Sequence, residues 1–360
     1  MAVPIPHAAL ARAVALAFGA AARVAAAEPL HGDASTRRYL RLRLDGAPVA
    51  GAIAMLLGEG RFAPGSDELG GGLAVDELPY LNVGRWLDAH GFPVPAVYAD
   101  RAAEDGLLLL EDCGDTSLWA AAAATPGEAP RLFGEAVDLL VGLQAAGDRH
   151  PDPACYAFRR RFDLRMARAE LEHFVEHGIE TRHGRRLPAG ARAELLARLE
   201  PVAAPFADDA PAALAHRDFM AWNLQVQSGR LRLLDFQDAL VAPDAYDLAA
   251  LLTDRTTATL VDDAAAGALV ARFAAARAAA GIPAPPGLAD RVRRCALHRA
   301  LKVVGRFHFL EMVKGKPGYL AYLPAVYAVA RRMLAGLPGL GDLAVHLAMH
   351  VPELRLRAGS

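Results

Sequence analysis

One stretch of this chain, residues 214–252, restricts its fold and chemistry more than any other: LAHRDFMAWNLQVQSGRLRLLDFQDALVAPDAYDLAALL. Asp218 stands five residues before Asn223, and a short apolar run leads to Asp235. Phosphoryl transfer uses a proton acceptor, an amide oxygen and a second carboxylate in this order. The protein supplies mainly positioning, a base for the attacking hydroxyl and Mg²⁺ to offset phosphate charge. The stretch therefore predicts a phosphoryl-transfer site.

The spacing of these three residues has a physical reason. A loop that holds Asp218 near a substrate hydroxyl can turn back over the next few residues, so that the amide oxygen of Asn223 reaches a metal. Mg²⁺ usually takes one or two carboxylates together with phosphate oxygens and water. The run Leu231–Leu234 predicts a buried strand that delivers Asp235 as the second ligand. The alternative is three polar residues on ordinary surface turns, and it leaves the apolar run and the Asp-Phe pair unexplained.

Length and composition limit the class of protein. With 360 residues the chain is long enough for two domains that each bury a core. Hydrophobic residues make up 54% and charged residues 22%, which is a globular composition. The net charge of −2 and the lack of mixed basic and aromatic runs argue against a nucleic-acid partner. Three widely spaced cysteines without a CxxC pair indicate a reducing compartment and no zinc site.

The N-terminal region is alanine-rich from Leu10 to Ala27. A signal peptide begins with positive charge, followed by an uninterrupted apolar core. Here the first eleven residues have no Lys or Arg, and Arg12 and Arg23 interrupt the apolar stretch. We therefore predict an amphipathic first helix. No stretch has the eighteen or so uninterrupted apolar residues of a membrane span, so we expect a cytoplasmic protein without a membrane partner.

Two antiparallel strands are predicted next. Leu40–Leu44 alternates apolar and charged residues, which is typical of a half-buried strand. Asp45-Gly46 predicts a hairpin turn, and Val49–Leu57 is an apolar returning strand. The preceding loop, residues 31–39, is small and polar, so it could cover the phosphates of a nucleotide. It has a single glycine, and a capped turn before a strand explains it equally well.

The chain then changes from strands to helices near residue 113. Helical spacing runs from Leu78 to His90, the apolar run Leu107–Leu110 predicts a central strand, and the Gly-rich residues 58–73 predict a mobile loop. Further helices are predicted at residues 130–146, 158–177, 191–199, 262–280, 288–313 and 322–334. The predicted fold class is α+β, with a small antiparallel-sheet lobe at residues 1–113 and a larger helical lobe at residues 114–360.

This order of elements resembles the bilobal protein-kinase-like fold, and in particular the aminoglycoside phosphotransferase family of small-molecule kinases. His216–Asp218, Asn223 and Asp235–Asp238 are similar to its catalytic loop and metal-binding turn, and the match covers nearly the whole chain. One branch is the bacterial cell-wall amino-sugar kinases, which phosphorylate the anomeric hydroxyl of N-acetylmuramate and N-acetylglucosamine in peptidoglycan recycling. The chain resembles that branch further at residues 32–39, 107–112, 235–239, 301–305 and 315–319.

The resemblance implies a role for each matched position. Asp218 is the expected catalytic base, and Asn223 and Asp235 are the expected Mg²⁺ ligands. Asp247 is expected to support the catalytic loop by accepting backbone N–H bonds, which keep a carboxylate ionised. ATP is the expected donor, and it would be contacted by the phosphate loop and by the backbone between the lobes at Gly32, Asp33, Ala34, Ser35, Thr36, Arg37, Glu111 and Cys113.

Two departures from the usual kinase pattern lie in the N-terminal part. Most kinases have a phosphate-binding lysine about where this chain has Met55, and the amino-sugar kinase branch also lacks that lysine. The following helix offers no clear acid to pair with such a lysine, because Asn82 lies near the expected position and Glu77 comes too early. We expect Arg37 or Arg38 to neutralise the phosphates instead, since a guanidinium binds phosphate bidentately.

A third departure lies in the catalytic loop. The residues Phe219–Trp222 stand where this branch more often has polar or basic side chains, which affects the expected sugar rather than the chemistry. Trp222 could stack on a sugar ring or anchor the loop, and we favour the anchor. The ring of His216 is expected to be buried and structural.

Besides Asp218, two other residues are candidates for substrate binding. Asp238 could bind a sugar hydroxyl, or it could cap a helix. Arg306 lies with Lys302 and His308 on a helix that would cover the substrate, where a carboxylate-bearing sugar would meet a cation. Solvated charges on a helix face explain these three residues at least as well.

The sequence thus predicts an ATP- and Mg²⁺-dependent kinase that acts as a monomer on the anomeric hydroxyl of N-acetylmuramate or N-acetylglucosamine. The first alternative is the same chemistry on another alcohol, such as an aminoglycoside or choline. The arginines after residue 290 argue against an aminoglycoside, because a polycation needs an acidic pocket. The second alternative is a non-catalytic nucleotide-binding regulator. The missing lysine suggests it, but the presence of Asp218, Asn223 and Asp235 together argues against it.

Overall fold

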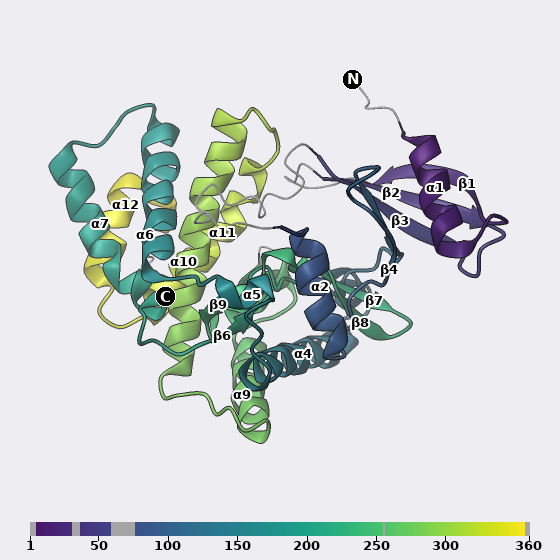
Figure 1. The fold of residues 1–360 in the computed structure, drawn as a ribbon. Helices are drawn as coiled ribbons and strands as arrows, with labels where there is room; N and C mark the ends of the chain where they lie inside the picture. Colours follow the sequence, from purple (N-terminus) through teal and green to yellow (C-terminus); the bar gives the residue numbers. More distant parts are fainter. Residues whose placement is uncertain (1–4, 31–36, 59–75, 255, 357–360) are drawn as a thin grey trace. The chain divides into compact units, whose positions relative to one another are not determined.

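The computed structural model describes residues 5–30, 37–58, 76–254 and 256–356. The chain forms two compact units, and Figure 1 shows the fold with most of its helices and strands labelled. The first unit comprises Met1–Thr116 with Gln225–Gln237, and the second comprises Ser117–Leu224 with Asp238–Ser360. The sequence predicts a boundary after residue 113. In the structure the first unit ends at Thr116 and also takes in the hairpin that leads to Asp235.

The first unit is built on a five-stranded antiparallel sheet with the strand order β1-β2-β3-β5-β4. The strands are β1 (Arg23–Leu30), β2 (Arg38–Asp45), β3 (Gly51–Leu56), β4 (Val97–Arg101) and β5 (Leu107–Glu111). The two strands predicted from alternation and from the returning apolar run are confirmed as β2 and β3. The predicted central strand is confirmed as β5, whose four leucines are buried.

The register of the sheet gathers apolar side chains on one face. Leu40 pairs with Ala54, and Ala54 pairs with Leu109. Side chains of paired residues point to the same face of a sheet, so these three form one row. The row packs in one core with helix α1 (His7–Phe18), whose Leu10 and Val14 are fully buried. Figure 1 shows α1 lying along this sheet.

The first helix is shorter than the sequence predicts. A helix was expected over Leu10–Ala27, but α1 ends at Phe18, where Gly19 has a φ of 88°. Residues Arg23–Leu30 form the edge strand β1 instead. The prediction was wrong for this half because the helix propensity of alanine is a weak preference, and hydrogen bonding to β2 overrides it.

Helix α2 (Pro79–Ala89) and a hairpin complete the first unit, and the predicted helix at Leu78–His90 is confirmed. Pro79 is the first residue of α2, where its missing N–H has no intrahelical partner to lose. The hairpin consists of β7 (Leu224–Gln227) and β8 (Arg230–Leu233). The Leu233 N–H donates to the Pro93 carbonyl at 2.9 Å, which joins β8 to the segment after α2.

The second unit is mostly helical. Its helices are α3 (Leu118–Ala124), α4 (Ala129–Arg149), α5 (Tyr156–Arg159), α6 (Leu164–His173), α7 (Ala189–Ala203), α8 (Tyr246–Thr253), α9 (Asp263–Ala279), α10 (Leu288–His308), α11 (Leu323–Gly336) and α12 (Gly341–His350). The six helices predicted after residue 114 correspond to α4, α6, α7, α9, α10 and α11, but residues 160–163 of the range predicted at 158–177 are not helical. The helices α3, α8 and α12 lie outside the predicted ranges. Two predicted helices continue as π-helix, at η2 (Phe174–Thr181) after α6 and at η6 (Phe309–Val313) after α10.

Helix α10 is central to the second unit, since it packs against α6, η2, α8 and α11. Figure 1 shows α10 between α6 and α11. It approaches η2 closely at two glycines. A Cβ atom on Gly305 would lie 2.7 Å from the Cα of Phe174, and one on Gly178 would lie 3.1 Å from Cγ1 of Val304 in α10. Cβ atoms are essentially never found within 3.0 Å of another heavy atom, and the atom near Gly305 belongs to the backbone, so this position requires glycine.

Two short strands of the second unit lie on either side of residues 216–239 in the sequence. β6 (Ala212–Ala215) and β9 (Leu240–Pro243) pair antiparallel. None of the helices within the described ranges has the length and apolar character needed to cross a membrane. An antiparallel sheet followed by a mainly helical part confirms the predicted α+β fold class.

Candidate active site

The predicted catalytic loop begins directly after β6 and is attached to α8. His216 and Arg217 donate their backbone N–H groups to the carboxylate of Asp247, at 2.6 Å to Oδ2 and 3.0 Å to Oδ1. Asp247 lies in the first turn of α8 and is fully buried. These bonds confirm the predicted role of Asp247 as a support of the loop. The ring of His216 is buried, as predicted.

The pKa of Asp247 is set by burial and by the groups around its carboxylate. Burial raises its pKa to about 6, while the neighbouring His216 and the two N–H bonds oppose this rise. The group is therefore mostly ionised at neutral pH and takes up a proton as the pH falls through 6. Below that pH, one of the two oxygens that hold the loop becomes a hydroxyl.

Arg217 has a strained backbone and a buried side chain. Its φ of 79° is in the left-handed region, which costs a non-glycine residue on the order of 1–2 kcal/mol. Its carbonyl accepts a hydrogen bond from Nη1 of Arg299 at 3.1 Å, and its Nη2 lies 3.9 Å from Oε1 of Glu170. Contacts on both the backbone and the side chain thus hold the conformation that precedes Asp218.

Asp218 is partly exposed and is surrounded by cations. Its side chain is 40% exposed, and its Oδ1 lies 3.9 Å from Nη2 of Arg299. Burial acts to raise its pKa, but the charges of Arg299, Arg217 and Lys302 outweigh burial and lower the pKa below its usual value. The loop therefore presents an ionised carboxylate that a substrate hydroxyl can reach, as a base requires.

Glu170 of α6 forms a buried centre of charge below the loop. Lys302 Nζ lies 2.6 Å and Arg217 Nη2 lies 3.9 Å from its Oε1, and His298 Nδ1 lies 3.8 Å from its Oε2. Burial lowers the pKa of His298 to about 4, so its ring is neutral at neutral pH, and its Nε2 is 3.1 Å from the Ala167 carbonyl. The negative charge of Glu170 therefore offsets the cations of Lys302 and Arg217.

Asn223 is oriented by the loop itself. Its Nδ2 donates to the backbone carbonyl of Asp218 at 2.8 Å, and its own N–H donates to the Met220 carbonyl at 2.9 Å. The turn predicted between Asp218 and Asn223 is thus closed by two hydrogen bonds. Because the amide nitrogen is used in the turn, the amide oxygen remains to act as an acceptor or a metal ligand.

Trp222 anchors the loop in the second unit. Its Nε1 donates to Oγ1 of Thr256 at 2.8 Å, and its ring stacks on Trp119 with the ring centroids 5.0 Å apart. The backbone N–H of Trp119 also donates to the Ala221 carbonyl. Of the two roles considered for Trp222, these contacts support the anchor.

Asp235 belongs to the first unit and is exposed. Its φ of 61° is in the left-handed region, which Asp tolerates better than most residues, and its Oδ1 accepts a hydrogen bond from Gln237 Nε2 at 2.8 Å. The next residue, Phe236, is buried with its ring 4.7 Å from that of Tyr80, and a Cβ on Gly84 would lie 3.1 Å from it. Phe236 thus fixes the turn on α2, while the carboxylate remains exposed.

The same neighbourhood includes the sheet face opposite α1. Met55, at the expected lysine position, is fully buried and pairs with Tyr39 on one side and Leu108 on the other. Burial raises the pKa of Tyr39, the positive charge of Arg37 opposes this rise, and the negative charge of Asp235 adds to it. Arg37, Tyr39 and Asp235 therefore lie near one another in the first unit.

The segment after β5 is fixed within the first unit. Asp112 accepts two hydrogen bonds from Arg41, at 2.7 and 3.0 Å. The Glu111 N–H donates to the Ala96 carbonyl at 2.8 Å, so it is not available to a nucleotide. Cys113 is buried, which raises the pKa of its thiol, and among the residues that the structure describes no hydrogen bond involves its backbone N–H or C=O.

The remaining predicted positions have different outcomes. Gly32–Thr36 lie outside the described residues, and so do residues 59–73 of the loop predicted at 58–73. Asp238 is 13% exposed and lies 3.7 Å from Nη1 of Arg160. The strand β9, not a helix, follows it, so the helix-capping alternative is wrong. Arg306 is half-buried on α10, with its guanidinium 5.5 Å from the centre of the Phe309 ring.

Comparison with family models decides the class of protein. Residues 26–290, most of the chain, match the model described as the phosphotransferase enzyme family. The chain belongs to this family.

Two named relatives of this phosphotransferase align with about nine-tenths of its sequence. The N-acetylmuramate/N-acetylglucosamine kinase of Pseudomonas aeruginosa is 30% identical over 326 residues, which cover 89% of this chain and 87% of the relative. The kinase of the same name from Caulobacter vibrioides is 32% identical over 357 residues, covering 90% and 92%. The predicted resemblance to the amino-sugar kinases is confirmed by these two relatives of that name.

A solved structure also supports the fold of the phosphotransferase. Spectinomycin phosphotransferase in complex with ADP and spectinomycin matches with a TM-score of 0.58 at 11% identity, covering 96% of this chain and 99% of the other. At this identity the match concerns the fold alone. It confirms the kinase-like architecture that the sequence predicts.

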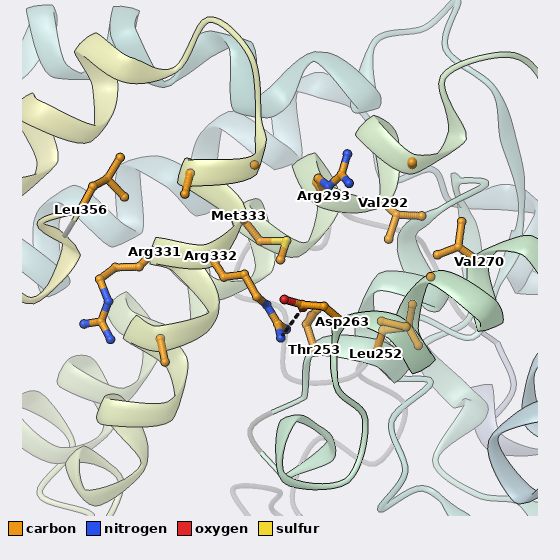
Figure 2. Close-up of a pocket in the computed structure, with 16 residues that line it drawn as sticks. Leu252, Thr253, Asp263, Val270, Val292, Arg293, Arg331, Arg332, Met333 and Leu356 are labelled. Atoms are coloured by element: carbon orange, nitrogen blue, oxygen red, sulfur yellow. Dashed lines mark hydrogen bonds and ion pairs between the residues drawn. The ribbon is translucent and has the colours of Figure 1, made fainter. Parts of the chain in front are cut away.

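The phosphotransferase also has a pocket that the sequence did not predict. Its volume is about 830 Å³, and it is lined by residues of α8, α9, α10 and α11 in the second unit (Figure 2). Figure 2 shows the Arg332 side chain reaching Asp263, with 3.1 Å between Nη1 and Oδ1. None of the predicted site residues lines this pocket, so it is separate from the catalytic loop.

Sequence reasoning missed two residues that surround the base of the phosphotransferase, Arg299 and Glu170. Arg299 lies three residues before Lys302, on the same face of a predicted helix, so helical spacing could have identified it. Glu170 is one of several acids in a charged helix, and no local pattern separates it from the others. Only its exposure of 5% in the folded chain does so.

Proposed function

We propose that this phosphotransferase transfers the γ-phosphoryl group of ATP to the anomeric hydroxyl of N-acetylmuramate or N-acetylglucosamine. The names of relatives that are 30% and 32% identical over about nine-tenths of the chain support this choice of acceptor. The observation that carries the proposal is Asp218, an ionised and accessible carboxylate on a loop that Asp247 holds by two backbone hydrogen bonds.

Asp218 would orient the sugar hydroxyl and accept its proton as the new O–P bond forms. The lowered pKa keeps the group ionised across the physiological range, so no fraction of the enzyme is lost to a protonated base. Arg299, 3.9 Å away, is a fixed countercharge that stays in place when the proton arrives. Positioning and electrostatics of this kind account for most of the catalysis of phosphoryl transfer.

Asn223 and Asp235 would hold Mg²⁺. Asn223 offers an amide oxygen, because its nitrogen is used by the Asp218 carbonyl, and Asp235 offers an exposed carboxylate. Both are oxygen donors, which Mg²⁺ prefers, and two protein ligands are enough when phosphate and water supply the rest. The ion would offset negative charge on the β- and γ-phosphate oxygens.

The first unit would bind ATP. The backbone of Cys113, with no hydrogen bond among the described residues, suits the adenine edge, whereas the Glu111 N–H is already used. Residues Gly32–Thr36 remain the proposed phosphate loop, and Arg37 remains the proposed cation in place of the lysine, because Met55 is fully buried and uncharged. Arg37 lies close to Tyr39, which faces the same side of the sheet as Met55.

The proposal is tested by ³¹P NMR of the protein with ATP, Mg²⁺ and each amino sugar. The expected result is a new phosphate resonance coupled to the anomeric proton, which identifies both the kinase activity and the position of transfer. Release of ADP without a phosphosugar would contradict the choice of acceptor and direct the search to another alcohol, such as choline or an aminoglycoside. No turnover with any alcohol would favour a nucleotide-binding regulator.

A further inference from the structure

The exposed face of α10 carries three cations in a row. Arg299, Lys302 and Arg306 are three and four residues apart, so they lie on one face of the helix. All three are partly exposed, while Leu301 and Val304 between them are buried. Arg299 marks the end of this row that lies beside the catalytic base, 3.9 Å from Asp218.

Two of the three cations are balanced by acids. Arg299 faces Asp218, and Lys302 lies 2.6 Å from the buried Glu170, which also faces Arg217. Arg306 differs from them, since no acidic partner lies within ion-pair distance of it among the described residues. A partly buried arginine without a countercharge is available to an anionic ligand, which a guanidinium can bind through two parallel hydrogen bonds.

The surroundings of Arg306 hold it in place. Its guanidinium lies 5.5 Å from the centre of the Phe309 ring, a cation–π distance. Phe309 begins the π-helix η6, and α10 packs at Gly305 against the other π-helix, η2. Short π-helical segments occur frequently at functional sites. Here two of them meet beside the unbalanced cation.

We propose that Arg306 binds the carboxylate of the acceptor, so that this phosphotransferase prefers an acidic amino sugar over a neutral one. Seven residues of helix separate Arg306 from Arg299, which is about 10 Å along α10. N-acetylmuramate has a lactyl carboxylate that N-acetylglucosamine lacks, so the two sugars differ in the group that Arg306 would bind. This inference rests on the proposed function, because it assumes that the sugar hydroxyl lies at Asp218.

The test measures binding of both sugars by calorimetry, in the presence of Mg²⁺ and a non-hydrolysable ATP analogue. Wild-type protein is expected to bind N-acetylmuramate more tightly than N-acetylglucosamine. In Arg306→Gln the Kd for N-acetylmuramate should rise about 10- to 100-fold, while the Kd for N-acetylglucosamine stays the same. Arg306→Lys should recover part of the lost affinity, because it keeps the charge but not the paired donors.

Arg293→Gln is the matched control. It removes the same charge from the same helix, but Arg293 forms an ion pair with Asp290 at 3.0 Å and lies away from the row. The ratio of its Kd values for the two sugars should equal that of the wild type.

An unchanged ratio in Arg306→Gln would overturn the inference while the kinase proposal stands. A loss of affinity for the ATP analogue in place of the acidic sugar would do the same. Absence of N-acetylmuramate binding to the wild type would overturn it as well. Binding without phosphosugar in the ³¹P experiment would count against the proposed function alone.

Discussion

The charge on Asp218 depends on side chains that are remote in the sequence. Arg299 of α10 lies beside the carboxylate, and Glu170 of α6 holds Arg217, the strained residue before it. Left-handed backbone at a non-glycine residue persists only where the surroundings enforce it, and such sites are often functional. The conformation of the loop is thus stabilised by buried ions rather than by local sequence preference.

Asp218→Asn removes the proposed base without changing the size of the side chain. Turnover should fall about 10²- to 10⁴-fold, because an amide cannot accept the proton. ATP affinity should stay near that of the wild type, since the proposed nucleotide contacts lie elsewhere. Steady-state kinetics and nucleotide titration measure the two quantities. Asp209→Asn, an exposed residue before β6, is the control and should match the wild type. Near-normal turnover of Asp218→Asn would contradict the role of the base.

Glu170→Gln leaves Lys302 and Arg217 without their buried anion. The free energy of unfolding should fall by about 3 kcal/mol, the low end for a broken buried pair, because Lys302 is 26% exposed. The kcat should fall as well, since the side chain of Arg217, the residue before Asp218, would lose its acidic partner. Denaturant titration and kinetics measure the two effects. In Glu200→Gln the loss should stay below about 1 kcal/mol, because the pair with Arg168 is about half exposed. Equal losses in both variants would contradict the role of Glu170.

His298 predicts how stability depends on pH. Its pKa is about 4 in the folded chain and 6.5 for an exposed histidine, so the unfolded chain binds the extra proton. Its contribution to stability is therefore complete above pH 6.5 and is lost as the pH falls toward 4. By pH 5.5 the loss is about 1.4 kcal/mol. Asp247, with a raised pKa of about 6, has the opposite sign between pH 4 and 6.

A comparison with His298→Gln isolates this effect, because an amide can still donate to the Ala167 carbonyl but does not titrate. Urea unfolding at pH 7.5, 6.5 and 5.5 should show the wild type losing about 1.4 kcal/mol more than the variant over this range. Asp247 contributes equally to both proteins and cancels in the comparison. Parallel curves would mean that folding does not lower the pKa of His298.

At the scale of single residues, the sequence predicts the proposed catalytic and metal-binding residues. It does not predict the charged residues that surround the base. Asp218, Asn223, Asp235 and Asp247 stand in one stretch at fixed spacing, so a local pattern identifies them. Glu170 lies 48 residues before Asp218 in sequence, and its role depends on burial, which composition does not reveal.

At the scale of elements, the crossing of η2 and α10 is the most restricted contact of the second unit. Gly305→Ala would put a methyl group 2.7 Å from backbone of η2, which no side-chain rotation relieves. We expect a loss of at least about 2 kcal/mol in the free energy of unfolding. The crossing lies one residue from Arg306, so binding of an acidic sugar should weaken too.

Gly267→Ala is the control for the same substitution in a helix. Its Cβ would have no heavy atom within 4 Å, so only helix propensity changes, and the variant should gain about 0.5–1 kcal/mol. Thermal or denaturant unfolding of the two variants should therefore shift in opposite directions. A stable Gly305→Ala variant would show that η2 can move away from α10.

Periodicity predicts where helices lie but not how they end or join. The patterns at residues 158–177 and 288–313 predict single helices. Residues 160–163 interrupt the first of them, and both end as π-helix where η2 packs against α10 and η6. Neither pattern distinguishes the wider π-helical turns from α-helix. The N-terminal error has the same origin. Alanines at Ala25–Ala27 favour helix locally, yet they lie in β1 because β2 offers hydrogen bonds.

At the scale of the whole molecule, the change from strands to helices predicts two compact units. It does not predict that β8 and Asp235 join the first unit, because the hairpin follows more than a hundred residues of the second. The contact that places it is the bond from Leu233 to the Pro93 carbonyl, together with the packing of Phe236 on Tyr80. A local sequence pattern cannot predict contacts between residues this far apart in the chain.

ATP binding to the folded chain should increase the free energy of unfolding of the whole protein. ATP at 100 times its Kd should raise the free energy of unfolding by about 2.7 kcal/mol, because the unfolded chain does not bind it. If Asn223 and Asp235 hold Mg²⁺, most of this gain should need the metal, so chelation with EDTA should remove it. Asp235→Asn should reduce the Mg²⁺-dependent part, while Asp342→Asn, a control in the first turn of α12, should retain it. Thermal unfolding with ATP, with and without Mg²⁺, measures each part. A metal-dependent gain that is the same in Asp235→Asn would place the metal ligand elsewhere in the chain.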